Sequence, residues 1–153
     1  MNFFSQLFGN YVLVCAMLGW TLAQVFKAVA TSIRDRKINW ERLFGAGGMP
    51  SGHSATVSAL VVSVSRKCGV DSVFFAFAVV LASIVIYDAM GVRRAAGEQA
   101  KVINKIVRIN NEDEDESNNI DAKVLKEKLG HTPIEVLAGV MLGVLIPLII
   151  PIN

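Results

Sequence analysis

The chain has 153 residues, of which 53% are apolar and 18% are charged, with a formal net charge of +2. This apolar fraction is high for a soluble protein and is concentrated in blocks, which indicates a membrane protein. The length suits one domain over residues 1–153, and two isolated cysteines predict neither a disulfide framework nor a metal site.

Three apolar blocks are long enough to cross a bilayer as helices, because a hydrocarbon core of about 30 Å needs about 20 such residues. They run from about Tyr11 to Ala30, from Val70 to Met90 and from Pro133 to Ile152. A fourth block, Ser54 to Arg66, is short and reaches an adequate length only if Pro50 to His53 lie in the interface. The sequence therefore predicts an all-α integral membrane bundle with about four transmembrane helices.

Basic residues gather in two of the connections between these helices. With four spans, the connections after the first and the third helix lie on the same side of the membrane, and the other side has only Arg66 and Lys67. The positive-inside rule then places both connections in the cytoplasm and both termini outside, in a multi-pass protein of the cell membrane. The basic residues on the predicted cytoplasmic side are Lys27, Arg34, Arg36, Lys37, Arg42, Arg93, Arg94, Lys101, Lys105, Arg108, Lys123, Lys126 and Lys128.

This topology brings the polar ends of all four helices to one face of the bundle. Ionisable groups in membrane segments are costly to bury, so they are functional candidates. A four-helix bundle would gather them around one polar site. The residues concerned are Lys27, Arg34, His53, Asp88, Arg93, Arg94 and His131, which include both histidines of the chain.

The third connection, residues 91–130, divides into two parts. From Glu98 to Ile109, apolar side chains lie mainly on one helical face and Lys101, Lys105 and Arg108 on the other. That pattern is typical of a helix lying on an anionic membrane surface. The acidic stretch NNEDEDESNN that follows has the composition of a disordered, solvated linker.

The stretch from Gly47 to Ala55 lies where a loop becomes a helix. Glycine lets backbone N–H groups approach an anion, and a helix N-terminus attracts phosphate, so Ser51 and the Gly52 amide could bind one. His53 could donate a proton to a leaving oxygen. The same residues also fit an ordinary helix start, with Ser51 or Ser54 as the N-cap.

His131 and Glu135 are four residues apart, so the carboxylate lies one helical turn from the imidazole. It could orient that imidazole as a nucleophile or a base. The alternative is a capping box, with Thr132 as N-cap, Pro133 at the first helical position and Glu135 bound to the backbone. The pattern leaves both interpretations open.

Lys27 and Arg34 are seven residues apart and therefore share one helix face. Together they could grip a phosphate. Alternatively, they are interfacial residues whose long side chains extend to the headgroups.

The stretch from Tyr87 to Gln99 is dense in charge directly after an apolar span. Paired arginines such as Arg93 and Arg94 can clamp phosphate oxygens, and Asp88 and Glu98 are candidates for a supporting role. The alternative is a juxtamembrane anchor in which Arg94 pairs with Glu98.

The motifs GGMPSGHSA, YDAMGVRRAAGEQA and LGHTPIEVLAG together resemble a divergent branch of the type 2 phosphatidic acid phosphatase and vanadium haloperoxidase superfamily. The superfamily pattern is lysine, six residues and Arg-Pro, then Pro-Ser-Gly-His, then Ser-Arg, five residues, histidine, three residues and aspartate. Lys27 and Arg34 have the first spacing, and Pro50 to His53 match fully. His131 and Glu135 match the last histidine and acid, with glutamate for aspartate.

Two positions depart from the superfamily pattern. Asp35 stands where the proline follows the arginine, and Leu125 stands where the last arginine precedes the histidine. We hypothesise that Arg93 or Arg94 replaces this missing arginine, because both are predicted to lie on the same membrane face as the motifs.

The resemblance implies a fold similar to the core of the type 2 phosphatidic acid phosphatase bundle, and a phosphohistidine mechanism. His131 would attack phosphorus, Glu135 would orient it, and His53 would protonate the departing oxygen. No metal or cofactor is needed, because fixed cations and amides stabilise the developing charge. The phosphate oxygens would be bound by Lys27, Arg34, Ser51, Gly52 and either Arg93 or Arg94.

The function indicated is that of a metal-independent membrane lipid phosphatase. Phosphatidylglycerophosphate, phosphatidic acid and polyprenyl diphosphate are candidate substrates, and the bilayer is the expected environment. A homo-oligomer is a candidate assembly, and no nucleic-acid partner is expected. The alternative is a non-catalytic membrane protein that binds phosphorylated lipid or acts as a scaffold or transporter component.

Overall fold

The computed structural model describes residues 2–36, 48–112, 124–125, 127 and 129–152, and the side chains of residues 34, 35, 111 and 112 are not described. Within these parts the regular structure is all helical, as the sequence predicts. The helices are α1 (Phe3–Phe8), α2 (Tyr11–Asp35), α3 (Gly52–Cys68), α4 (Val73–Met90), α5 (Val92–Glu112) and α6 (Pro133–Ile149).

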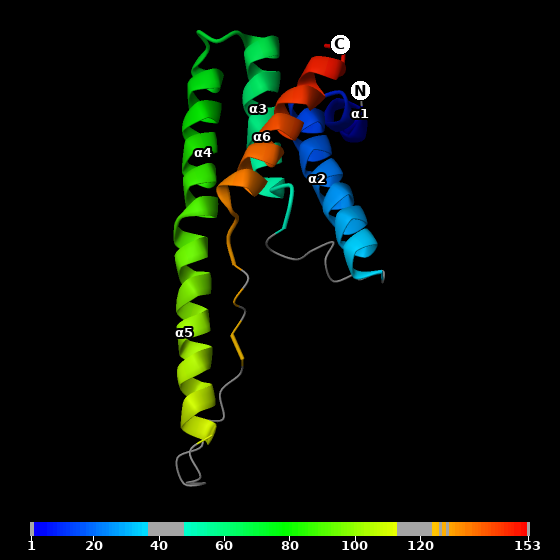
Figure 1. Cartoon of the computed structure of the whole chain (residues 1–153). Coiled ribbons are helices and arrows are strands. Elements are labelled where there is room, and N and C mark those ends of the chain that lie inside the picture. Colours follow the sequence, from blue (N-terminus) through cyan, green and yellow to red (C-terminus); the bar gives the residue numbers. More distant parts are fainter. Residues whose placement is uncertain (1, 37–47, 113–123, 126, 128, 153) are drawn as a thin grey trace.

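Helices α2, α3, α4 and α6 correspond to the four predicted spans and run alternately in opposite directions (Figure 1). One end of the bundle carries both chain termini and the α3–α4 connection, and we call it the terminal end. The opposite end, called the polar end, is formed by the C-terminal part of α2, the first turn of α3, the last turn of α4 and the first turn of α6. The predicted convergence of these four helix ends is therefore confirmed.

Helix α3 lies at the centre of the bundle and packs against α2, α4 and α6. Its 17 residues span about 25 Å at 1.5 Å per residue, so it is short for a full span, as its sequence indicates. Its buried residues include Ser54, Ser58 and Ser63. A helix surrounded by other helices needs small side chains more than apolar ones, because close backbone approach drives packing in membranes.

Glycines on the neighbouring helices allow this close approach. A Cβ atom at Gly139 or Gly143 of α6 would overlap the backbone carbonyl of Ser51 or Ala55, respectively. At Gly19 of α2, a Cβ atom would lie 2.9 Å from the carbonyl oxygen of Ala55. Helices α2 and α6 thus hold the start of α3 from two sides, and this fixes the backbone on which the polar end is built.

The outer surface of the bundle is apolar, as a bilayer-facing surface must be. By length and composition, two stretches of the described residues could cross a membrane, Tyr11–Ile33 and Val73–Asn110, and Pro133–Ile149 is a shorter apolar helix. Exposed apolar side chains on α4 and α6 include Phe74, Phe77, Val80, Ile84, Leu137, Met141, Leu145 and Leu148.

Helix α5 differs from the prediction in its length and its direction. It begins at Val92, six residues before the predicted start, because only Gly91 separates it from α4. It continues along the axis of α4, away from the bundle, instead of lying across the polar end (Figure 1). The predicted binding of this helix to an anionic membrane surface stays a prediction. The acidic tract lies outside the described residues from position 113 onward.

The terminal end is held by a cluster around Tyr11 and Arg66. The Tyr11 hydroxyl donates to the carbonyl oxygen of Pro147 (2.8 Å) and accepts from Arg66 Nη1 (2.8 Å). Arg66 Nη1 also donates to the Ile150 carbonyl (3.1 Å). These bonds satisfy carbonyl groups at the end of α6, where the helix stops and Pro151, four residues after Pro147, has no N–H to donate.

Candidate functional site

The two histidines face each other at the polar end. His53 is the second residue of α3, and His131 directly precedes the N-cap of α6. Their ring centroids are 6.2 Å apart, with an angle of 62° between the ring planes. The His131 side chain is only 5% exposed, whereas His53 is exposed. The site therefore pairs a buried imidazole with an accessible one.

Two backbone hydrogen bonds connect the segments that carry these histidines. The Ser51 N–H donates to the Glu135 carbonyl (2.9 Å), which joins the start of α3 to the first turn of α6. The His131 N–H donates to the Ala89 carbonyl (3.0 Å), which joins the segment before α6 to the end of α4. The arrangement of the site thus depends on main-chain contacts between three helix ends.

Glu135 fulfils both roles that its sequence context allows. Its Oε2 atom lies 3.1 Å from His131 Nδ1 and accepts the Thr132 N–H at 3.1 Å. The Glu135 N–H donates to Thr132 Oγ1 (3.4 Å), which completes the predicted capping box. When Nδ1 donates to Glu135, Nε2 of His131 is left unprotonated and available as a nucleophile.

The start of α3 is capped by Ser51, one of the two caps that the sequence allows. Ser51 Oγ accepts from the Ser54 N–H (3.3 Å) and from Ser54 Oγ (3.0 Å), and both serine side chains are fully buried. The Ser51 hydroxyl is therefore engaged in capping α3. Gly52 follows it as the first residue of α3, where backbone N–H groups lack helical partners.

Lys27 is buried at this end of the bundle, with 5% of its surface exposed. Its charge acts on Glu135 and on His53, which places its ammonium group within electrostatic reach of both motifs. Gly48, with φ of +91°, packs against the stem of Lys27, and a Cβ atom there would lie 3.4 Å from Lys27 Cγ. Arg34 belongs to α2, but its side chain lies outside the described part, so its role stays a prediction.

Some residues of the charged stretch after α4 lie near the site, and others lie along α5, which we call the arm. Arg93 Nε donates to Asp88 Oδ2 (2.7 Å), and the charges of both residues act on His53. Glu98 instead accepts from Lys101 Nζ at 3.0 Å, farther along α5. Asp88 and Arg93 thus lie within electrostatic reach of His53, and the bond seen for Glu98 is to Lys101 instead of the proposed partner Arg94.

Gln24 and Trp20, which are not among the predicted site residues, also border the site. A Cβ atom at Gly52 would lie 3.4 Å from Gln24 Nε2 and 3.6 Å from Trp20 Cδ1. Gln24 Oε1 is buried and has no hydrogen-bond partner among the described residues. The available signal was a polar residue within an apolar span, one turn before Lys27.

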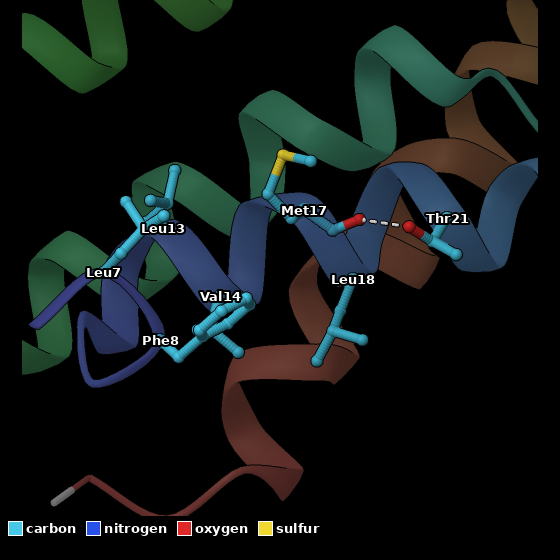
Figure 2. Close-up of a pocket in the computed structure, with 7 residues that line it drawn as sticks. All are labelled: Leu7, Phe8, Leu13, Val14, Met17, Leu18 and Thr21. Carbon is cyan, nitrogen blue, oxygen red and sulfur yellow. Dashed lines mark hydrogen bonds between the residues drawn. The ribbon is translucent and has the colours of Figure 1, made fainter. Parts of the chain in front are cut away.

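Two cavities formed by described residues are lined partly by α2 and by neither histidine. One of about 380 Å³ is lined by Leu7 and Phe8 of α1 and by residues of α2 from Leu13 to Thr21 (Figure 2). Its lining is almost entirely apolar, and the Thr21 hydroxyl is satisfied by the Met17 carbonyl (2.9 Å). Within the described ranges, no group of three or more His, Cys, Asp or Glu side chains could hold a metal ion.

Comparison with known proteins identifies relatives of this chain. The profile of a family described as "Divergent PAP2 family" matches residues 8–146. The chain is 43% identical over 152 residues to a protein of Bacillus subtilis (strain 168) named "Uncharacterized membrane protein YuiD", covering 95% of this chain and 96% of that protein. No solved structure matches the chain significantly.

Proposed function

The chain belongs to the Divergent PAP2 family, and from this membership and the facing histidines we propose that it hydrolyses a phosphorylated lipid at the membrane surface. The substrate is a phosphomonoester or diphosphate lipid, and the reaction passes through a phosphohistidine. The observation that carries the proposal is the pair of imidazoles 6.2 Å apart, of which the buried one is bonded to a carboxylate.

In the first step, Nε2 of His131 attacks phosphorus while the bond from phosphorus to the lipid oxygen breaks. Glu135 holds Nδ1–H and stabilises the positive charge that develops on the ring. The burial of His131 favours this assignment, because a side chain that is 5% exposed and bonded at one nitrogen is held in one orientation.

His53 donates a proton to the leaving oxygen in the same step and later accepts a proton from the water that attacks the phosphohistidine. Inorganic phosphate leaves, and both histidines return to their starting states. The exposure of His53 supports this role, because a proton donor to the leaving group must reach the substrate and exchange protons with water.

The phosphate oxygens lie among fixed positive groups in this proposal. Lys27 supplies a buried ammonium, Arg93 supplies a guanidinium within electrostatic reach of His53, and Gly52 supplies one backbone amide at the start of α3. Such preorganised donors stabilise the charge of a transferring phosphoryl group without reorganising. Arg34 is retained as a further candidate ligand of the phosphate. Ser51 contributes indirectly in this proposal, because its hydroxyl caps the start of α3 and does not bind the phosphate.

The polar end faces the cytoplasm in this proposal, since the two connections that follow α2 and α4 in the sequence contain nearly all of the basic residues of the connections. The substrate would then be a lipid phosphate of the cytoplasmic leaflet. Phosphatidylglycerophosphate, phosphatidic acid and polyprenyl diphosphate all present the required phosphate.

The competing function is binding of a phosphorylated lipid without hydrolysis. It is favoured by Leu125, which occupies the position of the superfamily's last arginine. The test is release of inorganic phosphate from a panel of these lipids by the purified full chain, beside His131→Ala and His53→Ala. If the chain hydrolyses the lipid, the wild-type protein releases inorganic phosphate and each variant does not. If it only binds the lipid, the wild-type protein associates with lipid and releases no phosphate from any substrate.

A further inference from the structure

Arg93 begins the arm formed by α5, yet its backbone lies directly beside the segment that carries His131. Gly130, with φ of +80°, packs so tightly against the peptide that joins Arg93 to Arg94 that a Cβ atom there would lie 2.5 Å from the Arg94 nitrogen and 2.9 Å from the carbonyl carbon of Arg93. The neighbouring His131 N–H is bonded to the Ala89 carbonyl. Arg93 is therefore attached to the same structural unit as the buried histidine.

The contact between Asp88 and Arg93 depends on the interruption of the helix at Gly91. In a continuous α-helix, residues five apart point about 140° away from each other and do not meet. Gly91 has φ of −95° and ψ of −85°, outside the helical range, and it separates α4 from α5. This break brings the Arg93 side chain back to Asp88, where Nε donates to Oδ2 at 2.7 Å.

The Asp88 bond leaves most of the Arg93 guanidinium for a ligand. Asp88 Oδ2 accepts the hydrogen bond from Nε. The two terminal nitrogens of the guanidinium remain available, and such a pair can donate to two oxygens of a phosphate. The side chains of Arg93 and Asp88 are 50% and 40% exposed, so the pair is open to solvent. Such a pair adds little to folding stability, and its contribution is the direction of the guanidinium.

We propose that Asp88 is a positioning residue that aims the terminal nitrogens of Arg93 at the phosphate bound between His53 and His131. This inference rests on the proposed function for the identity of the ligand. It also distinguishes Arg93 from Arg94 as the cation that replaces the missing arginine of the superfamily, because Arg93 is the one held by a carboxylate at the site.

The test is a double-mutant cycle with Asp88→Asn and Arg93→Ala in the purified full chain, measured as kcat and KM for lipid phosphate hydrolysis. Asp88→Asn is expected to lower kcat/KM about 10-fold in the presence of Arg93 and less than 2-fold in its absence. Asp88→Glu should retain more activity than Asp88→Asn, since it keeps the charge. Asp71→Asn, which removes an exposed carboxylate at the terminal end, is the matched control.

The inference is overturned if Asp88→Asn has no effect, or if its effect is equally large in the Arg93→Ala background, as a merely structural role would require. A second readout separates this outcome from failure of the proposed function. If the wild-type chain hydrolyses no lipid phosphate, the Kd of inorganic phosphate is measured for the same four proteins. If the effects of Asp88→Asn and Arg93→Ala on this Kd are simply additive, the inference is also overturned.

Discussion

His53 and His131 lie at the starts of different helices, and the fold places their ring centroids 6.2 Å apart. One ring is buried and bonded to a carboxylate, and the other is exposed. In the proposed reaction, these environments separate a nucleophile from a proton donor. The two roles respond differently to the chemistry of the leaving group, and this difference can be measured.

The first prediction concerns that leaving group. An aryl phosphate such as p-nitrophenyl phosphate releases a weakly basic oxygen that needs little protonation, whereas a lipid alcohol needs a proton donor. His53→Ala should therefore slow lipid phosphate cleavage by about 10²–10⁴-fold and aryl phosphate cleavage much less. His131→Ala should abolish both. Equal losses with both substrates in His53→Ala would contradict its assignment as the proton donor.

The second prediction separates the two bonds of Glu135. Glu135→Gln keeps an oxygen for the Thr132 N–H but removes the charge beside His131, so kcat should fall by at least about 10²-fold while the fold is retained. Thr132→Ala removes the cap and should destabilise the protein by about 1 kcal/mol with a much smaller effect on kcat. Thermal unfolding and steady-state kinetics are measured on both variants. A large loss of stability with little loss of kcat in Glu135→Gln, and the opposite in Thr132→Ala, would refute the prediction.

The third prediction concerns the packing of α6 on α3. Gly143→Val places a side chain where the Ala55 carbonyl lies, so the helices must separate, at an expected cost of about 1–3 kcal/mol. Met141→Ala is the control, because Met141 lies on the same helix but is 60% exposed. Thermal unfolding in detergent measures both. A midpoint that is unchanged in Gly143→Val would show that this contact does not hold the bundle.

The fourth prediction concerns orientation in the membrane. Cys68 is exposed at the terminal end, and Cys15 is buried in α2. If the polar end faces the cytoplasm, a membrane-impermeant maleimide should label Cys68 on intact cells of a Cys15→Ala variant. A cysteine placed at Glu98 in a variant without Cys68 should react only after permeabilisation. The opposite pattern would place the histidines outside.

Much of the fold follows from hydropathy and charge. The four spans and the gathering of their polar ends are predictable because apolar blocks of that length must alternate across a bilayer. Helix α3 is the span that the sequence indicates least strongly, because its apolar block is short, and Ser54, Ser58 and Ser63 interrupt that block. Its central position explains that composition, because it is packed by other helices.

The details of the site follow less directly from the sequence. Spacing predicted that Glu135 would bind either His131 or the backbone, and one oxygen atom does both. The choice between Arg93 and Arg94 could not be predicted, because it depends on the non-helical backbone at Gly91. The direction of α5 was also missed, since its amphipathic pattern does not reveal that it continues α4.

The most direct test of the proposed mechanism is whether phosphate becomes bonded to His131. The purified chain is mixed with lipid carrying a radiolabelled phosphate, quenched in alkali, and assayed for label on the protein beside label released to solution. An acid-labile label is expected on the peptide that contains His131, with neither label nor release in His131→Gln. Release by His131→Gln at a rate close to that of the wild-type protein would contradict the proposed mechanism.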